Sequence, residues 1–486
     1  MTATEPTRKT VPALIDGQWT AHTGPRHPVY NPATGREIAQ LPWATAGEVD
    51  RAVQAAHAAF KAWRETPVVD RVQPLYRFKA LLEKHAEEVA AILTSENGKT
   101  IEDARIEVRR AIQMFEVACG MPSLMMGDSL NDVSRGIDSR TVREPLGVCV
   151  GITPFNFPAM VPMWMLPFAV ATGNTFILKP SEKVPLTPTR CAELLVDAGL
   201  PEGVVQVIHG GKETVDALLR HPLVRAVSFV GSTPTAKYIY STAASHGKRV
   251  QALGGAKNHL VVMPDADMPK TVEAIIGSAF GAAGERCLAG SILVPVGEAA
   301  EPLLKLLTER TREMSVGDGS REGTGMGPVV TADARGRILG YIEKGLNEGA
   351  KILCDGRQRS HEGEGFFVGP TIFDNVQPSM TIARDEIFGP VLCVIRAESF
   401  DDAIDLINRS EFGNTTSIFT NSGKIAREFQ SRVEVGMIGV NIGVAAPMAF
   451  FPFAGWKNSF FGDLHAHGKD AVYFYTEQKV LMTRWF

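Results

Sequence analysis

Apolar residues recur every three or four positions through the first quarter of the chain. The segments VDRAVQAAHAAFKAW, within residues 47–64, and IEVRRAIQMFEVA, within residues 70–120, place these residues along one face of a helix. We therefore expect helices in both ranges. The next segment, PSLMMGDSLNDVSRGIDSRTVREPLGV, contains turn residues and a short alternating stretch, so the helical period ends there.

From residue 147 onward, short apolar runs alternate with helical segments. The runs GVCVGI, NTFILKP, VVQVIHG and AVSFVG are typical of strands, and TPTRCAELLVDAG, KETVDALLR and TPTAKYIYSTAAS are typical of helices. This alternation predicts an α/β fold with a parallel sheet and crossover helices. A second α/β block begins near Lys257. The tail, AVYFYTEQKVLMTRWF, alternates aromatic and β-branched residues with polar ones and predicts an edge strand that pairs with another subunit.

Composition places the chain among globular proteins of more than one domain. Its 486 residues exceed one compact core, 44% are hydrophobic and 21% are charged. A net charge of −4 offers no basic face for nucleic acid. The uncharged run from Pro145 to Leu178 is long enough to span a membrane, but four prolines interrupt it, so we expect strand, loop and short helix in a buried core.

Cysteine usage and the first residues bear on the compartment. The six cysteines are scattered and form no CxxC pair, which argues against a disulfide framework and against a zinc or other metal site. MTATEPTRKT lacks the apolar region of a secretory signal. We expect a protein of the reducing cytoplasm.

Cys287 is the first candidate for chemistry. Small residues surround it in GAAGERCLAG, so a substrate can approach the sulfur closely, and Arg286 adds positive charge nearby. A nucleophilic cysteine needs thiolate character and a partner for the developing oxyanion. Asn156, between prolines in TPFNFP, can supply such a donor. A buried structural cysteine and an asparagine that satisfies a turn remain alternatives.

Three further segments are candidates for cofactor binding. Lys179 and Glu182 follow a predicted strand, where ligands bind in open α/β sheets, although such residues are often only solvated. Ser232 begins a predicted helix whose free N–H groups favour phosphate, or it is a simple N-cap. Glu386 can bind a ribose diol or cap a turn. No G-x-G-x-x-G motif occurs, so a dinucleotide must be held without the usual glycine fingerprint.

In combination these motifs resemble the aldehyde dehydrogenase superfamily over almost the whole chain. The resemblance rests on NFP at 156–158, KPSE at 179–182, FVGST at 229–233, LGG at 253–255, GERC at 284–287 and EIFGPV at 386–391. It implies that Cys287 is the nucleophile and Asn156 the oxyanion donor. It also implies NAD contacts, for which the candidates are Thr153, Phe155, Lys179, Glu182, Lys183, Ser232, Gly254 and Glu386.

The segment RVQALGGAKN departs from the pattern of the superfamily. Hydrolytic members carry glutamate in E-L-G-G as a base for water, whereas this chain has Ala252. Alanine cannot accept a proton, so water attack on a thioacyl enzyme should be slow, while the thiol of coenzyme A needs less help. With GERCLAG and FPFAGWKNSFFGD, this feature is similar to the coenzyme A-acylating methylmalonate-semialdehyde dehydrogenase branch.

That resemblance implies decarboxylating oxidation of malonate or methylmalonate semialdehyde to acetyl-CoA or propionyl-CoA, as in valine and inositol catabolism. The substrate carboxylate needs a cation, for which Arg110 and Arg286 are candidates, with Arg109 an alternative to Arg110. A hydrolytic aldehyde dehydrogenase and a non-catalytic scaffold on the same fold are the other hypotheses.

The resemblance also implies a domain division and an assembly. Residues 1–121 and 147–256 are expected to form the NAD-binding domain and 257–467 the catalytic domain. Residues 122–146 and 468–486 are expected to form a β arm for oligomerisation, most simply in a homotetramer that is a dimer of dimers.

Overall fold

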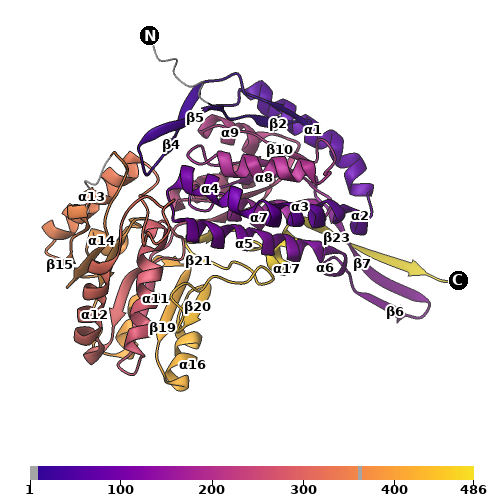
Figure 1. Ribbon diagram of the computed structural model, residues 1–486. Helices are drawn as coiled ribbons and strands as arrows, with labels where there is room; N and C mark the ends of the chain where they lie inside the picture. The colour runs from indigo at the N-terminus through magenta and orange to yellow at the C-terminus, as the bar shows by residue number, and fades with distance from the viewer. Residues whose placement is uncertain (1–8, 360–363) are drawn as a thin grey trace, which may run out of the picture.

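Two open α/β sheets make up the body of the chain, and a narrow arm leaves it on one side (Figure 1). The computed structural model describes residues 9–359 and 364–486. The first sheet has eight strands, in the order β22 (Phe460–Phe461), β12 (Arg249–Leu253), β11 (Val224–Val230), β8 (Val148–Ile152), β9 (Thr175–Lys179), β10 (Val205–Val207), β2 (Ala13–Ile15) and β3 (Gln18–Thr20).

The central strands of this sheet, from β12 to β10, are parallel, as the alternation of strands and helices predicts. Successive side chains of a strand point to opposite faces, so each strand contributes to two cores. In β8, Val148, Val150 and Ile152 pack on one face, and Cys149 packs on the other.

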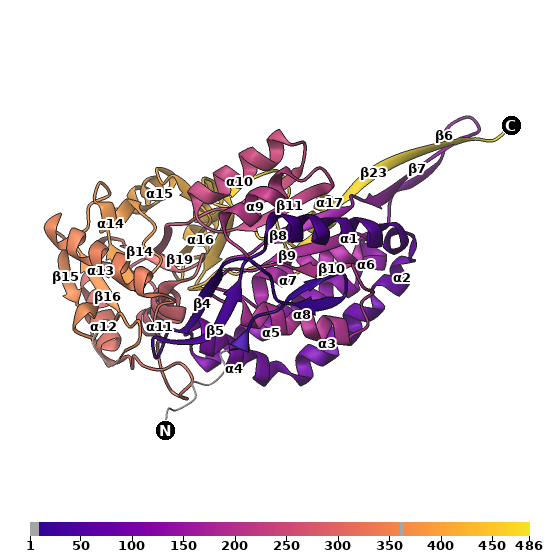
Figure 2. The same ribbon diagram turned by 90° about the horizontal axis from the view of Figure 1, so that it is seen from above.

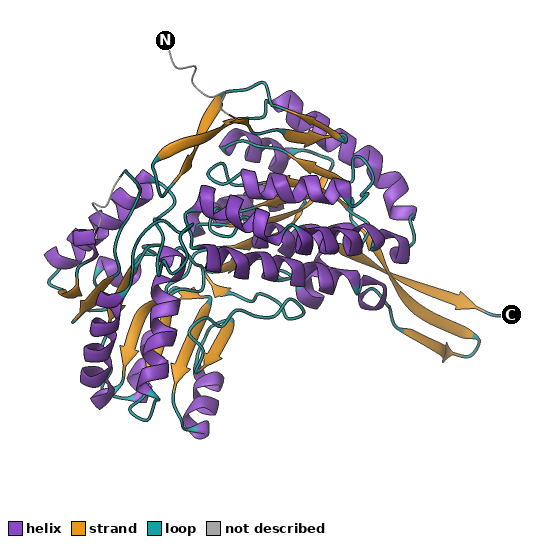
Figure 3. Cartoon of the chain, in the orientation of Figure 1, coloured by secondary structure: helices purple, strands orange, loops and turns teal. Residues whose placement is uncertain are grey.

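Helices cover both faces of the first sheet (Figure 3). One face carries α1 (Ala46–Glu65), α9 (Lys212–Arg220) and α10 (Thr233–Ser245). The other carries α3 (Gln73–Lys84), α4 (Ala86–Asn97), α5 (Ile101–Cys119), α7 (Met160–Ala171) and α8 (Leu186–Asp197). The short helices α2 (Val68–Arg71) and α6 (Met121–Leu124) lie beside α3 and α5.

The second sheet has seven strands and its own apolar core. Their order is β15 (Lys351–Cys354), β16 (Thr371–Asp374), β17 (Val391–Val394), β14 (Gly290–Pro295), β13 (Asn258–Val262), β19 (Thr415–Phe419) and β20 (Met437–Val440), with only β15 antiparallel. The accompanying helices are α11 (Met268–Phe280), α12 (Ala300–Glu313), α13 (Ala332–Asn347), α14 (Thr381–Arg384), α15 (Phe400–Asn408) and α16 (Gly423–Arg432).

Smaller sheets complete the fold. The pair β18 (Phe412–Gly413) and β21 (Trp456–Lys457) lies near the second sheet, and β1 (Lys9–Thr10), β5 (Arg36–Pro42) and β4 (Arg26–Asn31) form a three-stranded sheet. The arm consists of β6 (Ser129–Ser134), β7 (Ile137–Pro145) and β23 (Thr476–Arg484), and the C-terminus lies at its tip (Figure 2).

The uncharged run forms β8, α7 and β9 in the first core, as predicted. Every residue of α7 from Val161 to Ala171 is buried, and the helix accommodates Pro167. Within the described part of the chain, no helix is both long and apolar enough to cross a membrane.

The prediction of a single strand over the tail is wrong in its first half. Residues Gly468–Phe474 form the helix α17, and the strand begins only at Thr476. Ala471, Val472 and Phe474 are buried in the first core, which explains why this aromatic segment coils instead of extending. The strand β22 also pairs with β12, so part of the range 257–467 belongs to the first sheet.

Candidate active site

Cys287 lies in a loop between the second sheet's helix α11 and strand β14. The loop begins with the turn η1 (Gly281–Gly284), in which Ala282 and Ala283 adopt positive φ angles of 48° and 53°. Such a conformation costs an L residue about 1–2 kcal/mol, so surrounding contacts must hold it. The amides of Asn258 and Asn414 both donate to the Cys287 carbonyl at 2.9 Å, which fixes the loop at Cys287.

A cavity of about 280 Å³ reaches the Cys287 side chain. It is lined mainly by apolar residues, including Phe157, Met160, Trp164 and Phe453. Burial raises the pKa of the Cys287 thiol to about 12, and the negative charge of Glu386 adds to this effect. Burial therefore favours the neutral thiol, and a positive charge bound nearby would favour the thiolate.

Asn156 lies in the loop between β8 and α7. The side chain is 5% exposed, and no hydrogen bond of its amide to any described residue occurs. The loop itself is tightly held, because Lys99 donates to the Asn156 carbonyl at 2.7 Å and Asn97 donates to the Phe155 carbonyl at 3.0 Å. A fixed loop with a free amide suits the stabilisation of a ligand oxygen.

Lys99 and Glu107 form a buried ion pair beneath this loop, at 2.6 Å. Glu107 also accepts hydrogen bonds from the N–H groups of Ala159 and Met160, where α7 begins. Neither residue was predicted from the sequence. A signal was present, because Glu107 lies on the apolar face of its helix, together with Ala104, Val108 and Ala111.

Most of the predicted cofactor residues lie around the carboxyl ends of β8, β9 and β11. Lys179 is buried and forms an ion pair with Glu182 at 3.4 Å. Burial opposes ionisation of Glu182, but the Lys179 charge holds the pKa of its carboxyl below the ordinary value. Burial lowers the pKa of Lys179 itself. The Thr153 N–H donates to the Lys179 carbonyl, which joins the two strand ends.

Aromatic and helix-end groups extend this region. The ammonium of Lys183 lies 4.6 Å from the centre of the Phe155 ring, which in turn meets Phe388 edge to face. Ser232 occupies the N-cap position of α10 but makes no capping hydrogen bond from its side chain, bonding instead to Thr235 at 2.9 Å. The start of α10 therefore keeps N–H groups available for an anion.

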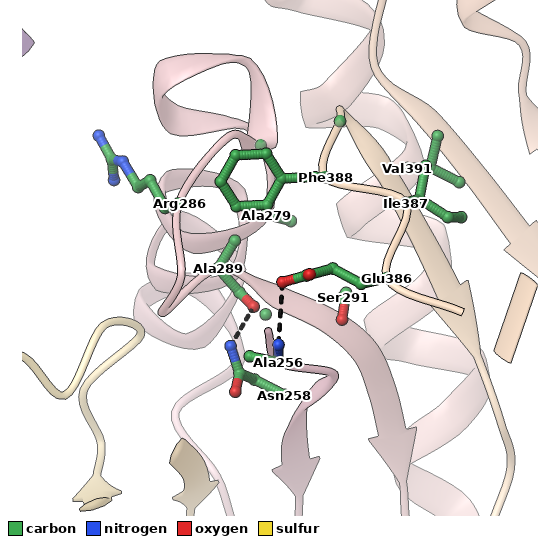
Figure 4. A pocket seen from close by; sticks show the side chains of 13 residues that line it. Ala256, Asn258, Ala279, Arg286, Ala289, Ser291, Glu386, Ile387, Phe388 and Val391 are labelled. Atoms are coloured by element: carbon green, nitrogen blue, oxygen red, sulfur yellow. Dashed lines mark hydrogen bonds between the residues drawn. The ribbon is translucent and has the colours of Figure 1, made fainter. Parts of the chain in front are cut away.

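Glu386 reaches across from the second sheet to the end of the first. Its carboxylate accepts a hydrogen bond from the Ala256 N–H at 2.9 Å, and Arg286 points away from it (Figure 4). A Cβ atom on Gly255 would lie 2.4 Å from this carboxylate, so only glycine permits the approach. Gly254, the glycine predicted to contact the cofactor, donates its N–H to the Ser459 carbonyl.

The two candidate arginines line the same cavity as Cys287 but differ in their partners. Arg286 is paired with Asp103 at 2.7 Å. Arg110 contacts Gln113 and Met448, and no carboxylate among the described residues pairs with it. Arg109 is exposed, so Arg110 is the member of this dipeptide that lines the cavity.

Ala252 is fully buried in β12, between Phe229 on one neighbouring strand and Phe461 on the other. It contributes only a methyl group to the apolar cluster on the α10 side of the sheet. Glu285, two residues before Cys287, is also buried, and burial raises its pKa to about 8. This burial favours the neutral carboxyl, and the carboxyl oxygens accept a hydrogen bond from the Val330 N–H.

No group of three or more histidine, cysteine, aspartate or glutamate side chains within residues 9–359 and 364–486 has the arrangement of a metal site. All six cysteines are free.

Comparisons with known proteins connect this geometry to a family. The profile of the aldehyde dehydrogenase family matches residues 19–481. Malonate-semialdehyde dehydrogenase 3 of Geobacillus kaustophilus is 52% identical over 479 residues, covering 98% of this chain and 99% of the relative. Malonate-semialdehyde dehydrogenase of Pseudomonas aeruginosa is 50% identical over 475 residues, covering 97% of this chain and 96% of the relative.

Solved structures agree with these relatives. A crystal structure of methylmalonate-semialdehyde dehydrogenase from Oceanimonas doudoroffii matches with a TM-score of 0.97 and 49% identity, covering 98% of both chains. A Sinorhizobium meliloti protein assigned to the same activity, complexed with NAD, matches with a TM-score of 0.97 and 44% identity, covering 99% of both chains. These matches confirm the α/β fold predicted from the sequence.

Proposed function

This chain belongs to the aldehyde dehydrogenase family, and on that premise we propose that it is a NAD-dependent, coenzyme A-acylating dehydrogenase of malonate and methylmalonate semialdehyde. The products are acetyl-CoA or propionyl-CoA, with CO2 and NADH. The names of the relatives support the substrate class, and the NAD complex of a structural neighbour supports the cofactor. Coenzyme A as acyl acceptor rests on the chemistry of the site.

The residues around Cys287 suit acyl transfer. The sulfur of Cys287 bonds to the aldehyde carbon, and the carbonyl oxygen gains the displaced electron pair. The Asn156 amide and the Cys287 N–H donate hydrogen bonds to that oxygen, which lowers the barrier to its formation. NAD, when bound, supplies a hydride acceptor and a positively charged ring whose field favours the thiolate. Loss of the hydride leaves a thioester on Cys287.

The cofactor region fits NAD on several observations. The side chain at the N-cap of α10 leaves N–H groups for a phosphate, and Lys179, Glu182 and Lys183 lie at the strand ends nearby. Gly255 opens the space through which Glu386 reaches the Ala256 backbone, which places a carboxylate where a ribose hydroxyl can bind it. Thr153 and Phe155 line the approach to Asn156.

The proposal that coenzyme A accepts the acyl group rests on Ala252. A fully buried methyl group at this position neither orients water nor accepts its proton. The thiolate of coenzyme A needs no such base, and thioester exchange is nearly balanced in energy. Because no carboxylate at position 252 activates water, the acyl group is transferred to coenzyme A instead.

The cavity suits a short aldehyde that carries a carboxylate. Arg110 offers a positive charge without a carboxylate partner of its own among the described residues, and the paired Arg286 lies on the same wall. A carboxylate β to the thioester carbonyl can leave as CO2, because the remaining electron pair delocalises onto the thioester oxygen. Asn156 and the Cys287 N–H stabilise that enolate as they do the first oxyanion.

The exposed apolar residues of the arm support a homotetramer. The free cysteines support a location in the cytoplasm. Leu130, Val480 and Met482 expose between 64% and 68% of their surface on the arm, which favours a homotetramer that buries them. Six unpaired thiols favour a reducing compartment, the cytoplasm.

Product analysis tests the proposal. The protein is incubated with NAD, coenzyme A and malonate semialdehyde labelled in its carboxylate carbon. We expect acetyl-CoA, NADH and labelled CO2 in equal amounts, and propionyl-CoA from methylmalonate semialdehyde. Free acetate or malonate with unconsumed coenzyme A would support the hydrolytic hypothesis instead. No NADH with any aldehyde would support the non-catalytic one.

A further inference from the structure

Asp103 joins α5 to the loop that carries the nucleophile. One carboxylate oxygen of Asp103 accepts a hydrogen bond from the Ala282 N–H at 3.1 Å, and the other accepts from the Arg286 guanidinium at 2.7 Å. Both partners lie on the loop between α11 and β14, on either side of Glu285. One side chain of the first core's helix layer thus holds two points of a loop from the second sheet.

The held segment needs such support. Ala282 and Ala283 have positive φ angles, and Gly284 follows with a φ of 69°, so three consecutive residues are left-handed. Only the last of these is a glycine, and a Cβ there would meet the Gly389 carbonyl at 2.2 Å. L residues rarely adopt this conformation without surrounding contacts that impose it. The Asp103 hydrogen bond reaches the first of the three.

Asp103 also decides how charge is distributed along the cavity wall. Asp103, Arg110, Arg286 and Cys287 all line the same cavity. Arg286 gives one guanidinium nitrogen to Asp103 and another to the Gly277 carbonyl at 3.2 Å. Asp103 therefore compensates Arg286, and the positive charge without a carboxylate partner in the described structure is that of Arg110.

We propose that Asp103 is a positioning residue for Cys287, which holds the left-handed turn and the Arg286 side chain so that the sulfur meets the aldehyde in a fixed geometry. By compensating Arg286, it also directs the substrate carboxylate to Arg110. The second statement rests on the proposed function, whereas the first applies to any aldehyde that the protein oxidises.

Steady-state kinetics of three variants with two aldehydes test the first statement. Asp103→Ala removes both acceptors, Asp103→Asn keeps the shape and one acceptor, and Glu102→Gln removes a charge from the same helix turn at an exposed position without touching the loop. Malonate semialdehyde and uncharged propanal are compared in the presence of NAD and coenzyme A.

We expect Asp103→Ala to lower kcat at least about tenfold with both aldehydes, because an ångström of misplacement can cost about a hundredfold. The KM for propanal should stay within about twofold, Asp103→Asn should retain an intermediate kcat, and Glu102→Gln should behave as wild type. A kcat of Asp103→Ala within about twofold of that of Glu102→Gln would overturn the positioning role.

The pH profile of Cys287 alkylation by iodoacetamide separates positioning from mere stability. Without the Asp103 charge, the charge of Arg286 is uncompensated beside Cys287, so the midpoint of the Asp103→Asn profile should move to lower pH. An unmoved midpoint together with a lowered melting temperature would reduce Asp103 to a structural residue.

The two proposals fail in different ways. If wild type oxidises propanal but not malonate semialdehyde, the proposed substrate is wrong, and the kcat comparison with propanal still tests Asp103. Propanal has no carboxylate, so an equal decrease in the KM for propanal and for malonate semialdehyde in Asp103→Asn would not involve the carboxylate. The statement that Asp103 directs the substrate carboxylate to Arg110 would then be wrong.

Discussion

Ala252 is the residue on which the proposed choice of acyl acceptor depends. Hydrolytic members of the superfamily that the sequence resembles place a glutamate here, and the structure encloses the alanine methyl group between Phe229 and Phe461. The buried Glu285, two residues before Cys287, already accepts a hydrogen bond from the Val330 N–H, and burial raises the pKa of its carboxyl to about 8, which favours the neutral form. Water is therefore a poor acceptor for the acyl group.

Restoring a carboxylate should restore hydrolysis. In Ala252→Glu we expect coenzyme A-independent NADH formation to rise by about 10–100-fold, since a positioned general base contributes about 100-fold or more. The measurement is steady-state NADH formation with malonate semialdehyde in the absence of coenzyme A. Ala252→Gln is the matched control, of similar size but unable to accept a proton. Equal rates in the two variants would show that a base at this position is irrelevant.

Arg110 should bind the substrate carboxylate. In Arg110→Ala we expect the KM for malonate semialdehyde to rise about tenfold or more, because a hydrogen bond to a charged group is worth about 1.5–3 kcal/mol. The KM for propanal should change little. The control is Arg109→Ala, which removes an exposed arginine one residue away. An unchanged KM for malonate semialdehyde in Arg110→Ala contradicts the assignment.

The residues proposed to bear the chemistry could be predicted from the sequence because each lies in a short local motif. Cys287, Asn156 and Glu386 stand in GERC, NFP and EIFGPV. Asp103, Lys99 and Glu107 were not visible, because their partners come from elements distant in the chain. Only the assembled fold shows that a helix carboxylate touches the nucleophile loop.

At the scale of the element, α5 is the part of the fold on which the site depends most. Its first turn carries Asp103, the next turn carries Glu107, and a further turn carries Arg110. These three residues contact, in order, the nucleophile loop, the start of α7 and the substrate cavity. The helix therefore links the loop of Cys287, the loop that follows Asn156 and the cavity that Arg110 lines.

Breaking the buried pair on this helix should destabilise the fold. Glu107→Gln leaves the Lys99 charge buried without a carboxylate, so we expect unfolding in urea to need about 3–5 kcal/mol less free energy. The exposed Glu102→Gln on the same helix serves as the control and should leave the midpoint nearly unchanged. An equal decrease in the free energy of unfolding in both variants would mean that the ion pair of Lys99 and Glu107 contributes no more to stability than an exposed charge on the same helix.

Element types followed from the sequence where periodicity was clear, as in α1 and α5. The tail was assigned wrongly because aromatic residues are common in strands, whereas here the first core buries Phe474 and Tyr475 on a helix turn. Alternation of side-chain type is a weak guide when tertiary packing buries one side of a short helix. The pairing of β22 with β12 had no local signal at all.

In the molecule as a whole, the arm is the surface that we expect to contact another subunit. Val480 and Met482 are exposed on β23, which pairs with β7 along its whole length. We expect Val480→Asp with Met482→Asp to convert the proposed homotetramer into smaller species, because charges are poorly tolerated in a buried interface. Light scattering coupled to size exclusion measures the mass. Val69→Asp, at an exposed apolar position on α2, is the control.

A tetramer that survives the double substitution would contradict the role of the arm in assembly. The domain division and the arm came from family resemblance, because periodicity does not state which strands are neighbours. The order of strands in both sheets follows from long-range pairing that a single sequence does not display. The α/β class itself was predictable from the alternation of elements.

We propose that the acyl group of the thioester on Cys287 is transferred to coenzyme A and not to water. The most direct measurement is NADH formation from malonate semialdehyde and NAD, followed in time with and without coenzyme A. We predict a burst of about one NADH per subunit without coenzyme A, followed by slow turnover, and sustained turnover when coenzyme A is added. Equal sustained rates in both conditions would contradict the account.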